Sequence, residues 1–414
     1  MFENGIYSWR ESCGKNLSIA IAGDVCPGDH AADAILNGES RKILQEIQPA
    51  LDRADLRLVQ WETVISGHWK PITKSGPNLL VPPGCEAFIT AGRFDVALLA
   101  NNHIGDHSPA GVLDTIRHIR NAGVRTVGAG CNSADAAKPL HLEKNGLRIS
   151  ILNFCETEFG TAGEDVPGSN AMDEMADLLQ IRSERRENDV VLVVVHGGNE
   201  YNPIPSPRMR KLYSAFARAG ASAVVNIHTH CPQGIELVEN VPIVYCPGNF
   251  FFPSVSGAPF DPHQFWWSGY LPRISFDERG AYEIELTPYC FSPDPWKIEP
   301  LRGKQRQWFL DYVDQISRMA LSEGDHWFDV WCAYRCEAML TWVKNSPAAA
   351  LLENLSDHDA LRKLPVIRHM FTCQAHCEVT RRMFLLIEQG KIQRLREELP
   401  ELADLQRAKF ADLM

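Results

Sequence analysis

Residues 190–201 read VVLVVVHGGNEY, an unbroken aliphatic run that ends in a histidine and two glycines. Such a run predicts a β-strand that is apolar on both faces and therefore buried between two layers. Further short runs rich in aliphatic residues end at Gly23, Trp61, Ala100, Phe154, His228 and Phe250. Segments of helical spacing separate them, for example 108–121 and 205–219, so we expect a layered α/β domain with a buried parallel sheet.

The pattern of apolar and polar residues changes in the last third of the sequence. After about Gly269, two alternating runs around an Asp-Glu-Arg-Gly turn predict a hairpin that closes the first domain. From about residue 302 only helical spacing continues, with predicted breaks at 323–324, at 345–347 and at Gly390. We therefore expect two domains, residues 1–302 and an all-α accessory domain over residues 303–414.

Composition excludes several classes of protein. The chain has 414 residues, of which 45% are apolar and 22% charged, as in globular proteins. Its 41 basic against 52 acidic side chains argue against a nucleic-acid groove or an anionic membrane surface. The first residues show no secretion signal, and no aliphatic run approaches the ~20 residues that span a bilayer. We expect a cytoplasmic protein with no nucleic-acid partner, no membrane span and mostly reduced thiols.

Polar side chains follow five of the predicted strands at the point where each strand ends. They are Asp24, Glu62, Asn101, Asn102, His103, His196, His228 and His230. Because the carboxyl ends of parallel strands share one edge of a sheet, these side chains are expected to converge. Carboxylate, amide and imidazole donors suit Zn, Mn or Fe. Two ions ~3.5–4 Å apart need a bridging carboxylate, for which Asp24 and Glu62 are candidates, and such a pair can activate water.

The triplet after the third strand suggests a division of roles. Adjacent side chains diverge at a strand end, so Asn102 can coordinate a metal while His103 faces the substrate as a general acid. Asp106 is placed to orient that imidazole. A single Gly-Asp or a single buried histidine is more often structural, but His228 and His230 share a strand face. The joint occurrence at five strand ends favours a metal site.

Six motifs occur in a fixed order along the first domain. They are Gly-Asp-Val (23–25), Trp-Glu-Thr (61–63), Ala-Asn-Asn-His (100–103), His-Gly-Gly-Asn-Glu-Tyr (196–201), His-Thr-His (228–230) and Pro-Gly-Asn-Phe-Phe-Phe (247–252). Together they resemble the bacterial capsule synthesis family, the CapA-like proteins associated with poly-γ-glutamate production, within the calcineurin-like metallophosphoesterase superfamily. The resemblance covers roughly residues 17–290. It implies a four-layer α/β/β/α sandwich, where periodicity alone suggests a three-layer sheet.

The resemblance also implies a ligand set for two divalent ions, Mn, Zn or Fe, with Mg or Ca as further options. The implied ligands are Asp24, Glu62, Asn102, His196, His228 and His230. His103 would be the acid, and Asn249 would support the site or contact the substrate. Gly197 stands where the family commonly has tryptophan, so the pocket wall is expected to differ, and the resemblance does not cover the helical region.

Other residues near the motifs are candidates for substrate contacts. Lys74 and Arg208 follow motif-bearing strands and can pair with substrate anions, although solvated loop charges explain them equally well. Trp266 and Trp267 belong to an aromatic cluster around His263. We expect this cluster to cover the rim of the site, which suits a peptide or another partly apolar ligand.

Two cysteine pairs lie in the predicted helical region at a spacing that places each pair on one helix face. They are Cys332 with Cys336 and Cys373 with Cys377, and His369 and His376 lie near the second pair. The pairs can bind zinc or form disulfides within a helical hairpin. Burial as small apolar side chains is the more common role of cysteine and is favoured.

Three functions remain open. The favoured one is a metal-dependent, dinuclear hydrolase that acts on a phosphoester or on a γ-glutamyl or peptide-like substrate. A second keeps the ions as Lewis acids that acidify a C–H beside a peptide carbonyl, giving epimerisation or another tailoring step. A third is a metal-stabilised, non-catalytic scaffold whose helical domain recruits a protein partner. The many polar residues at strand ends argue against the third, because burying them is costly.

Overall fold

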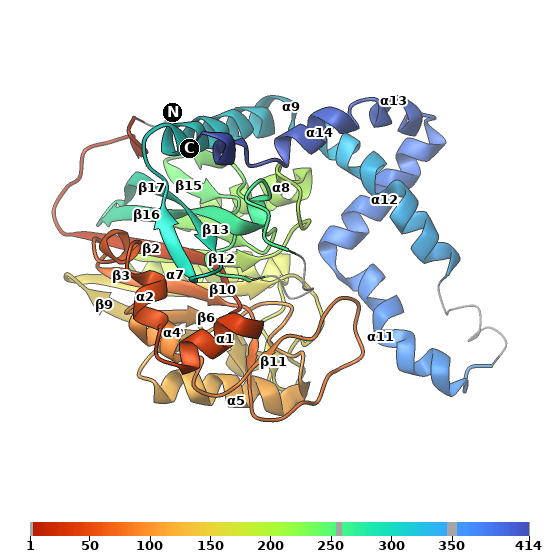
Figure 1. Cartoon of the computed structure of the whole chain (residues 1–414), viewed down its shortest axis with the longest axis horizontal. Helices are drawn as coiled ribbons and strands as arrows, with labels where there is room; N and C mark the ends of the chain where they lie inside the picture. Colours follow the sequence, from red (N-terminus) through yellow and green to blue (C-terminus); the bar gives the residue numbers. More distant parts are fainter. Residues whose placement is uncertain (1–2, 254–258, 346–353, 414) are drawn as a thin grey trace.

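Two β-sheets packed face to face form the centre of the molecule (Figure 1). The structure is a computed structural model that describes residues 3–253, 259–345 and 354–413. The first sheet has the order β1-β17-β16-β2-β3-β6-β7, with β18 paired to β17, and the second has the order β14-β15-β13-β12-β10-β9.

The first sheet comprises β1 (Ile6–Ser8), β2 (Asn16–Val25), β3 (Leu56–Trp61), β6 (Val96–Leu98), β7 (Arg125–Val127), β16 (Ser268–Asp277), β17 (Gly280–Ser292) and β18 (Lys297–Pro300). The second comprises β9 (Leu140–Lys144), β10 (Leu147–Cys155), β12 (Val190–His196), β13 (Ala223–Ile227), β14 (Ile235–Val238) and β15 (Val241–Val244). Short strands β4 (Val64–Ile65) and β5 (Leu80–Val81) pair with each other, as do β8 (Ala129–Gly130) and β11 (Gly168–Ser169).

Alternate side chains of the strands enter different cores. In β2, Ile19 and Ile21 face the core between the sheets together with Leu192 of β12, whereas Ala20 and Ala22 belong to a core under helices. Val191 and Val193 of β12 pack in a third core on the opposite outer face. These two strands are apolar on both faces because both of their faces are covered.

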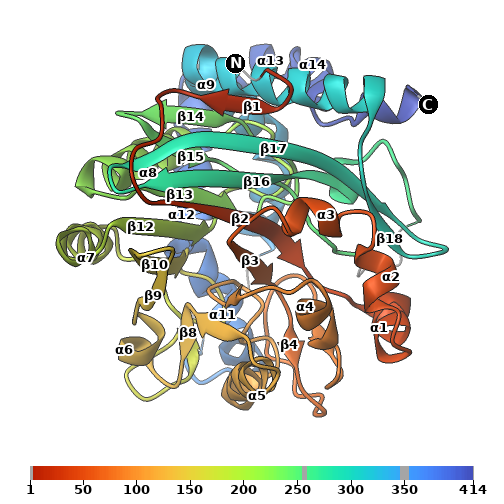
Figure 2. The same ribbon diagram turned by 90° about the vertical axis from the view of Figure 1, so that its left-hand side faces the viewer.

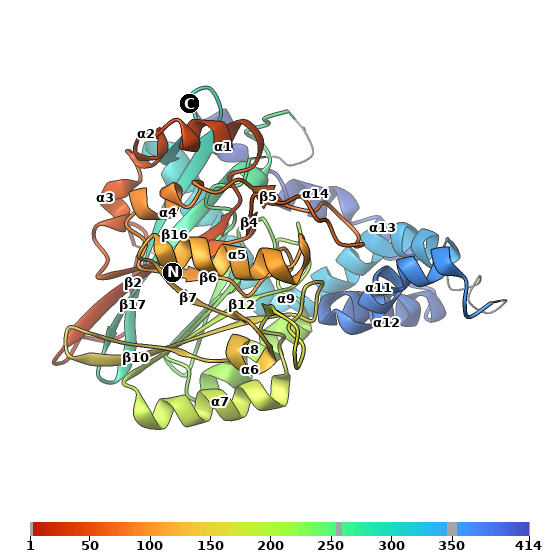
Figure 3. The same cartoon turned by 90° about the horizontal axis from the view of Figure 1, so that it is seen from below.

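Helices cover both outer faces of the pair of sheets. The first sheet is covered by α1 (Asp29–Leu36), α2 (Ser40–Leu44), α3 (Gln48–Leu51), α4 (Ala87–Ala91) and α5 (Ser108–Asn121), and the second by α7 (Glu174–Glu187) and α8 (Pro207–Ala219). Figure 3 shows α5 and α7 on opposite sides of the sheets, with α6 (Ser133–Ala136) on the side of α7. The four-layer α/β/β/α sandwich is confirmed, and the three-layer sheet suggested by periodicity alone is wrong.

Parallel pairing in both sheets brings the carboxyl ends of distant strands to one edge. β2, β3, β6 and β7 pair in parallel, as do β10, β12, β13 and β15. The predicted hairpin is confirmed as β16 and β17, which extend the first sheet antiparallel to β2 (Figure 2). The predicted helices at 108–121 and 205–219 are found as α5 and α8.

The region after residue 302 is helical, as predicted. It contains α9 (Gly303–Lys344), α11 (His358–Thr372), α12 (Gln374–Glu388), α13 (Ile392–Arg396) and α14 (Leu399–Leu405). The start of α9 packs Phe309 and Val313 into the core between the sheets, and α11 to α13 project from the sandwich (Figure 1). No helix among the described residues has the length and apolar character needed to cross a bilayer.

One predicted helix break is wrong. The pair at 323–324 lies inside α9, where a Cβ on Gly324 would come 3.0 Å from an Arg210 guanidinium nitrogen. Gly324 is buried beside the flexible Arg210 side chain, and the helix continues through it. The other breaks agree with the structure as far as it is described: α9 ends at Lys344, residues 346–347 lie outside the described part, and α12 ends just before Gly390 at a positive φ of 66°.

Asp177, in the first turn of α7, makes the stability of the folded chain depend on pH. The buried Asp177 carboxylate accepts a hydrogen bond from the Asp173 amide at 3.0 Å, and burial raises its pKa from 3.8 to about 8. The folded chain therefore keeps a proton that the unfolded chain loses, so this group lowers the free energy of unfolding by up to about 1.4 kcal/mol per pH unit as pH rises towards 8. Asp177→Asn keeps an acceptor oxygen and has no proton to lose.

We expect the stability of Asp177→Asn relative to the parent chain to rise across this pH range in urea unfolding. Asp165→Asn, at an exposed aspartate, controls for the change in net charge. A difference between Asp177→Asn and the parent that stays constant with pH would contradict the prediction.

Candidate metal centre

The end of β2 shows how the backbone aims one of the predicted ligands. Gly23 is an extra residue in the pairing of β2 with β3, and such a bulge re-aims the side chain that follows it, here Asp24. A Cβ on Gly23 would lie 1.8 Å from the carbonyl oxygen of Gly248, so only glycine permits this approach. The amides of Phe250 and Phe251 donate to the Asp24 carbonyl at 2.9 and 3.1 Å. The segment from Gly248 to Phe251 therefore holds Asp24 at the edge of the sheet.

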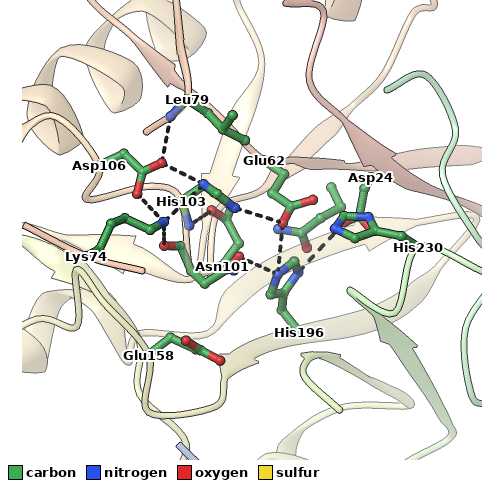
Figure 4. A network of polar contacts seen from close by, with 12 residues as sticks. Asp24, Glu62, Lys74, Leu79, Asn101, His103, Asp106, Glu158, His196 and His230 are labelled. Carbon is green, nitrogen blue, oxygen red and sulfur yellow. Dashed lines mark hydrogen bonds and ion pairs between the residues drawn. The ribbon is translucent and has the colours of Figure 1, made fainter. Parts of the chain in front are cut away.

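The structure brings the six predicted ligands together from five strand ends. Figure 4 labels Asp24, Glu62, His196 and His230 among them. Asp24, Glu62 and His196 form one group, and Glu62, His228 and His230 form a second. Within each group the potential donor atoms lie within 4.8 Å of one another. Glu62 belongs to both groups, which is the position that a bridging carboxylate needs.

Side chains from the two sheets lie close together inside the centre. His196 Nε2 lies 3.0 Å from Asn102 Oδ1 and 3.4 Å from Glu62 Oε1. Asp24 stands between two imidazoles, with its carboxylate oxygens 3.8 Å from His196 Nδ1 and 3.6 Å from His230 Nδ1. The donors thus surround a small buried volume from several sides.

Several donor atoms of the centre are buried without a hydrogen-bond partner. Among the described residues, none reaches either carboxylate oxygen of Asp24 or Glu62, or Nδ1 of His196 and His228. Buried polar atoms in that state are costly unless something else satisfies them. A donor set of carboxylates, imidazoles and an amide oxygen fits divalent transition metals, so these residues fit the ions that the family resemblance implies.

The electrostatics of the protein alone favour the neutral imidazoles that bind metal but oppose the ionised carboxylates. Burial, followed by the neighbouring Glu62 charge, raises the pKa of Asp24 well above its usual value. Burial likewise raises the pKa of Glu62 and lowers those of His196 and His228. Bound cations reverse this preference for carboxylates, because they stabilise the ionised form.

The backbone of the His-Thr-His segment is strained. His228 and His230 adopt positive φ angles of 125° and 55°. Such conformations cost non-glycine residues about 1–3 kcal/mol and cluster at functional sites. The surrounding structure therefore imposes the conformation that turns both imidazoles into the centre.

A buried charged network holds His103 beside the centre. His103 Nδ1 lies 2.6 Å from Asp106 Oδ2, and Lys74 Nζ lies 2.6 Å from the other Asp106 oxygen (Figure 4). The Leu79 amide also donates to Asp106 at 2.7 Å. Because a carboxylate carries no proton, we assign the Nδ1 proton to His103, which leaves Nε2 facing Glu62 Oε1 at 4.0 Å.

The same network sets the charge states of its members. Burial raises the pKa of Asp106, but the charges of His103 and Lys74 outweigh it and hold that pKa below its ordinary value. Burial and then the Lys74 charge lower the pKa of His103, against the opposing effect of Asp106. Lys74 is only 3% exposed and is bound to Asp106. Its position favours a role in holding this network, whereas the sequence suggested a direct substrate contact.

Asn249 and the two tryptophans form the wall beside His230. Asn249 Oδ1 lies 2.8 Å from His230 Nδ1, and its amide nitrogen donates to the Trp266 carbonyl at 3.0 Å. This contact fixes the orientation of the His230 imidazole, which is the role that partners of metal-bound histidines play. The Trp266 ring lies 4.7 Å from that of His230. The buried Trp267 and the exposed Tyr201 help to line a neighbouring cavity of about 650 Å³.

Arg208 does not join this group. Its guanidinium pairs with the carboxylates of Glu156 and Glu378, and its backbone amide donates to Glu378 at 2.9 Å. The position therefore gives no support to a substrate contact. The same Glu156 accounts for Gly197, because a Cβ at that position would lie 2.6 Å from the Glu156 Cγ.

A cavity of about 370 Å³ beside the centre is lined by residues that the sequence did not place at the site. Besides Asn102, His103 and His228 it is lined by Glu158, Asn199, Glu200, Arg335, His369 and His376. Glu158 lies in the loop after β10, whose predicted strand received no polar end residue. The strand-end rule would have pointed to Glu156, which directly follows β10 and pairs with Arg208, and nothing in the sequence places Glu158 or the helical residues here.

The cysteines are free thiols, so the predicted disulfide alternative is wrong. All twelve lie in the described part of the chain and none is paired. Cys332 and Cys336 are buried in α9, which confirms the apolar interpretation for this pair. Cys373 is buried beside Glu158, with Sγ 3.1 Å from its Oε1, and Cys377 is partly exposed.

A protein family and several described proteins are similar in sequence to this chain over most of the sandwich. Residues 18–254 match the family described as "Bacterial capsule synthesis protein PGA_cap". The "Capsule biosynthesis protein CapA" of Bacillus anthracis is 30% identical over 247 residues, 58% of this chain and 60% of the relative. The "PGA biosynthesis protein CapA" of Bacillus subtilis (strain 168) is 27% identical over 296 residues, 70% of this chain and 76% of the relative. The chain thus spans 60% and 76% of the lengths of these two relatives.

Solved structures give more distant likenesses. A hypothetical protein from Thermus thermophilus aligns with a TM-score of 0.42 at 16% identity, over 66% of this chain and 99% of its own. The 5'-nucleotidase from Candida albicans aligns with a TM-score of 0.37 at 10% identity, over 67% of this chain and 52% of its own. The family match spans more than half of the chain and includes all six predicted ligands. This chain is therefore a member of the bacterial capsule synthesis protein (PGA_cap) family.

Proposed function

We propose that this protein is a metal-dependent hydrolase that holds two divalent ions in the candidate metal centre. The observation that carries the proposal is Glu62, which is fully buried, has no hydrogen-bond partner among the described residues and belongs to both groups of donors. A carboxylate in that position is what two neighbouring cations require.

The residues of the centre have distinct roles in this proposal. Asp24, Glu62, Asn102, His196, His228 and His230 hold the ions. Manganese, zinc or iron bound there would supply Lewis acidity and activated water. His103 Nε2, which carries no proton in the assigned tautomer, takes a proton from water before it gives one to the leaving group, and Asp106 and Lys74 keep its ring in place. Asn249 orients His230 through the contact at Nδ1.

The proposed substrate is a phosphoester or a γ-glutamyl or peptide-like molecule. Two neighbouring cavities lead to the centre, one lined by Trp266, Trp267 and Tyr201 and the other by polar residues including Arg335. Aromatic rings bind apolar parts of a ligand, and a guanidinium binds carboxylate or phosphate. The descriptions of the relatives as capsule and PGA biosynthesis proteins add support for a γ-glutamyl substrate.

Metal content and turnover test the proposal together. Protein purified without chelators should contain at least two transition-metal ions per chain by inductively coupled plasma mass spectrometry. Chelation should abolish turnover in a screen of phosphoesters and γ-glutamyl peptides, and added Mn, Zn or Fe should restore it. Screening in deuterium oxide also detects Cα–H exchange without hydrolysis, which would replace hydrolysis by the tailoring chemistry.

Variants complete the test. Asp24→Ala and His228→Ala should lose ions and turnover together, whereas His141→Ala, at an exposed histidine on β9, should keep both. Full metal-stimulated turnover in both ligand variants would refute the assignment. Metal binding without any turnover would favour a scaffold.

A further inference from the structure

A second cluster of metal-binding side chains lies where the helical region meets the sandwich. It consists of Glu158, His369, Cys373 and His376, and one donor atom from each lies within 4.8 Å of all the others. None of these four belongs to the candidate metal centre. Three of them lie beyond residues 18–254, so the family match does not account for the cluster.

The corner between two helices presents three of the four donors. His369 is in the last turn of α11, Cys373 links α11 to α12, and His376 is in the first turn of α12. The three side chains therefore converge because the chain turns at Cys373. The rings of His369 and His376 are 4.8 Å apart, and Cys373 is fully buried.

The fourth donor comes from the sandwich. Glu158, in the loop after β10, contacts His369 Nε2 and lies 3.1 Å from Cys373 Sγ. The described residues form no hydrogen bond with the imidazole of His376, which lines the cavity of about 370 Å³. Glu158 lies outside the dashed network that joins the other labelled side chains of the centre in Figure 4.

The geometry points to a separate binding site for one zinc-class divalent ion, held by Glu158, His369, Cys373 and His376. One thiolate, two imidazoles and one carboxylate form a donor set of the number and type that tetrahedral zinc prefers. Such an ion would fasten α11 and α12 to the loop after β10. Because Asn102, His103 and His228 line the same cavity, it would also fix the wall opposite the metal centre.

Cobalt distinguishes this site from the metal centre. A cobalt–thiolate bond gives a near-ultraviolet charge-transfer band, and the ligands proposed for the centre contain no sulfur. Protein loaded with Co²⁺ should show this band, and Cys373→Ser should lose the band and one ion per chain. Cys377→Ser is the matched control, because Cys377 lies one turn further along α12 and contacts the Met370 carbonyl at 3.6 Å.

Two further variants keep the result interpretable. Glu62→Ala should retain the band while it loses the ions of the centre, so failure of this site and failure of the proposed function are distinguishable. His376→Gln leaves the buried thiol in place and should weaken cobalt retention against a competing chelator by at least about 10- to 100-fold. Absence of the band in the loaded parent chain, or its persistence in Cys373→Ser, would overturn the inference.

Discussion

Glu62→Ala is expected to release the ions of the metal centre and to reduce kcat/KM by at least about 10³, on the order of 4 kcal/mol of transition-state stabilisation. Glu62 is the one side chain shared by both donor groups, and its Oε1 lies 3.4 Å from His196 Nε2. Its loss removes a ligand from each proposed ion and the negative charge that lets two cations stay close. Metal content and turnover should therefore fall together.

A stability measurement separates ligand loss from misfolding. In chelator the parent chain buries the carboxylates of Asp24 and Glu62 together, and each lacks a hydrogen-bond partner among the described residues. Removing one of them relieves that cost, so Glu62→Ala should be at least as stable as the parent when both are metal-free. Glu143→Ala, at an exposed position of β9, should match the parent in metal content and turnover. Two bound ions and normal turnover in Glu62→Ala would contradict the prediction.

The strand-end rule found the candidate ligands because it depends on local sequence and on one property of parallel sheets, although it did not predict that the strand ends of two sheets meet at the centre. Asp24, Glu62 and His196 each follow an aliphatic run, and parallel pairing is enough to bring the ends of β2 and β3 together. The rule did not require the strand order. Choosing between one sheet and two does require the strand order, because β2 pairs with β16, which comes some 250 residues later in the chain. A run that is apolar on both faces fits either arrangement.

The sequence could not predict contacts between side chains that lie far apart in the chain, because these contacts also depend on how the strands and helices pack. Arg208 looked free to bind a substrate because its partner Glu378 comes 170 residues later. Glu158 meets His369 across 211 residues, so neither residue alone indicated a cluster. Gly324 looked like a helix break because glycine lowers helix propensity, whereas the buried Trp327 and Phe328 that follow it keep the chain helical through this position.

His103→Gln is expected to lower kcat by about 10²–10⁴ while the ions stay bound, because general acid catalysis contributes that much and His103 is not in either donor group. The loss should depend on the leaving group. A nitrophenolate leaves without a proton, so an activated ester should lose little turnover, whereas an alkyl ester or an amide should lose the full factor. Turnover of both substrate types, with metal content measured on the same samples, checks this.

Neighbouring variants test whether the network acts through the His103 imidazole. Asp106→Asn removes the carboxylate that receives the Nδ1 proton at 2.6 Å, so it should show the same dependence on the leaving group with a smaller loss. His118→Gln, on α5 and paired with Glu86, changes a histidine outside the centre and should leave both substrates unaffected. An equal loss for activated and unactivated substrates in His103→Gln would assign this histidine to substrate or metal positioning, because only proton donation makes its contribution depend on the leaving group.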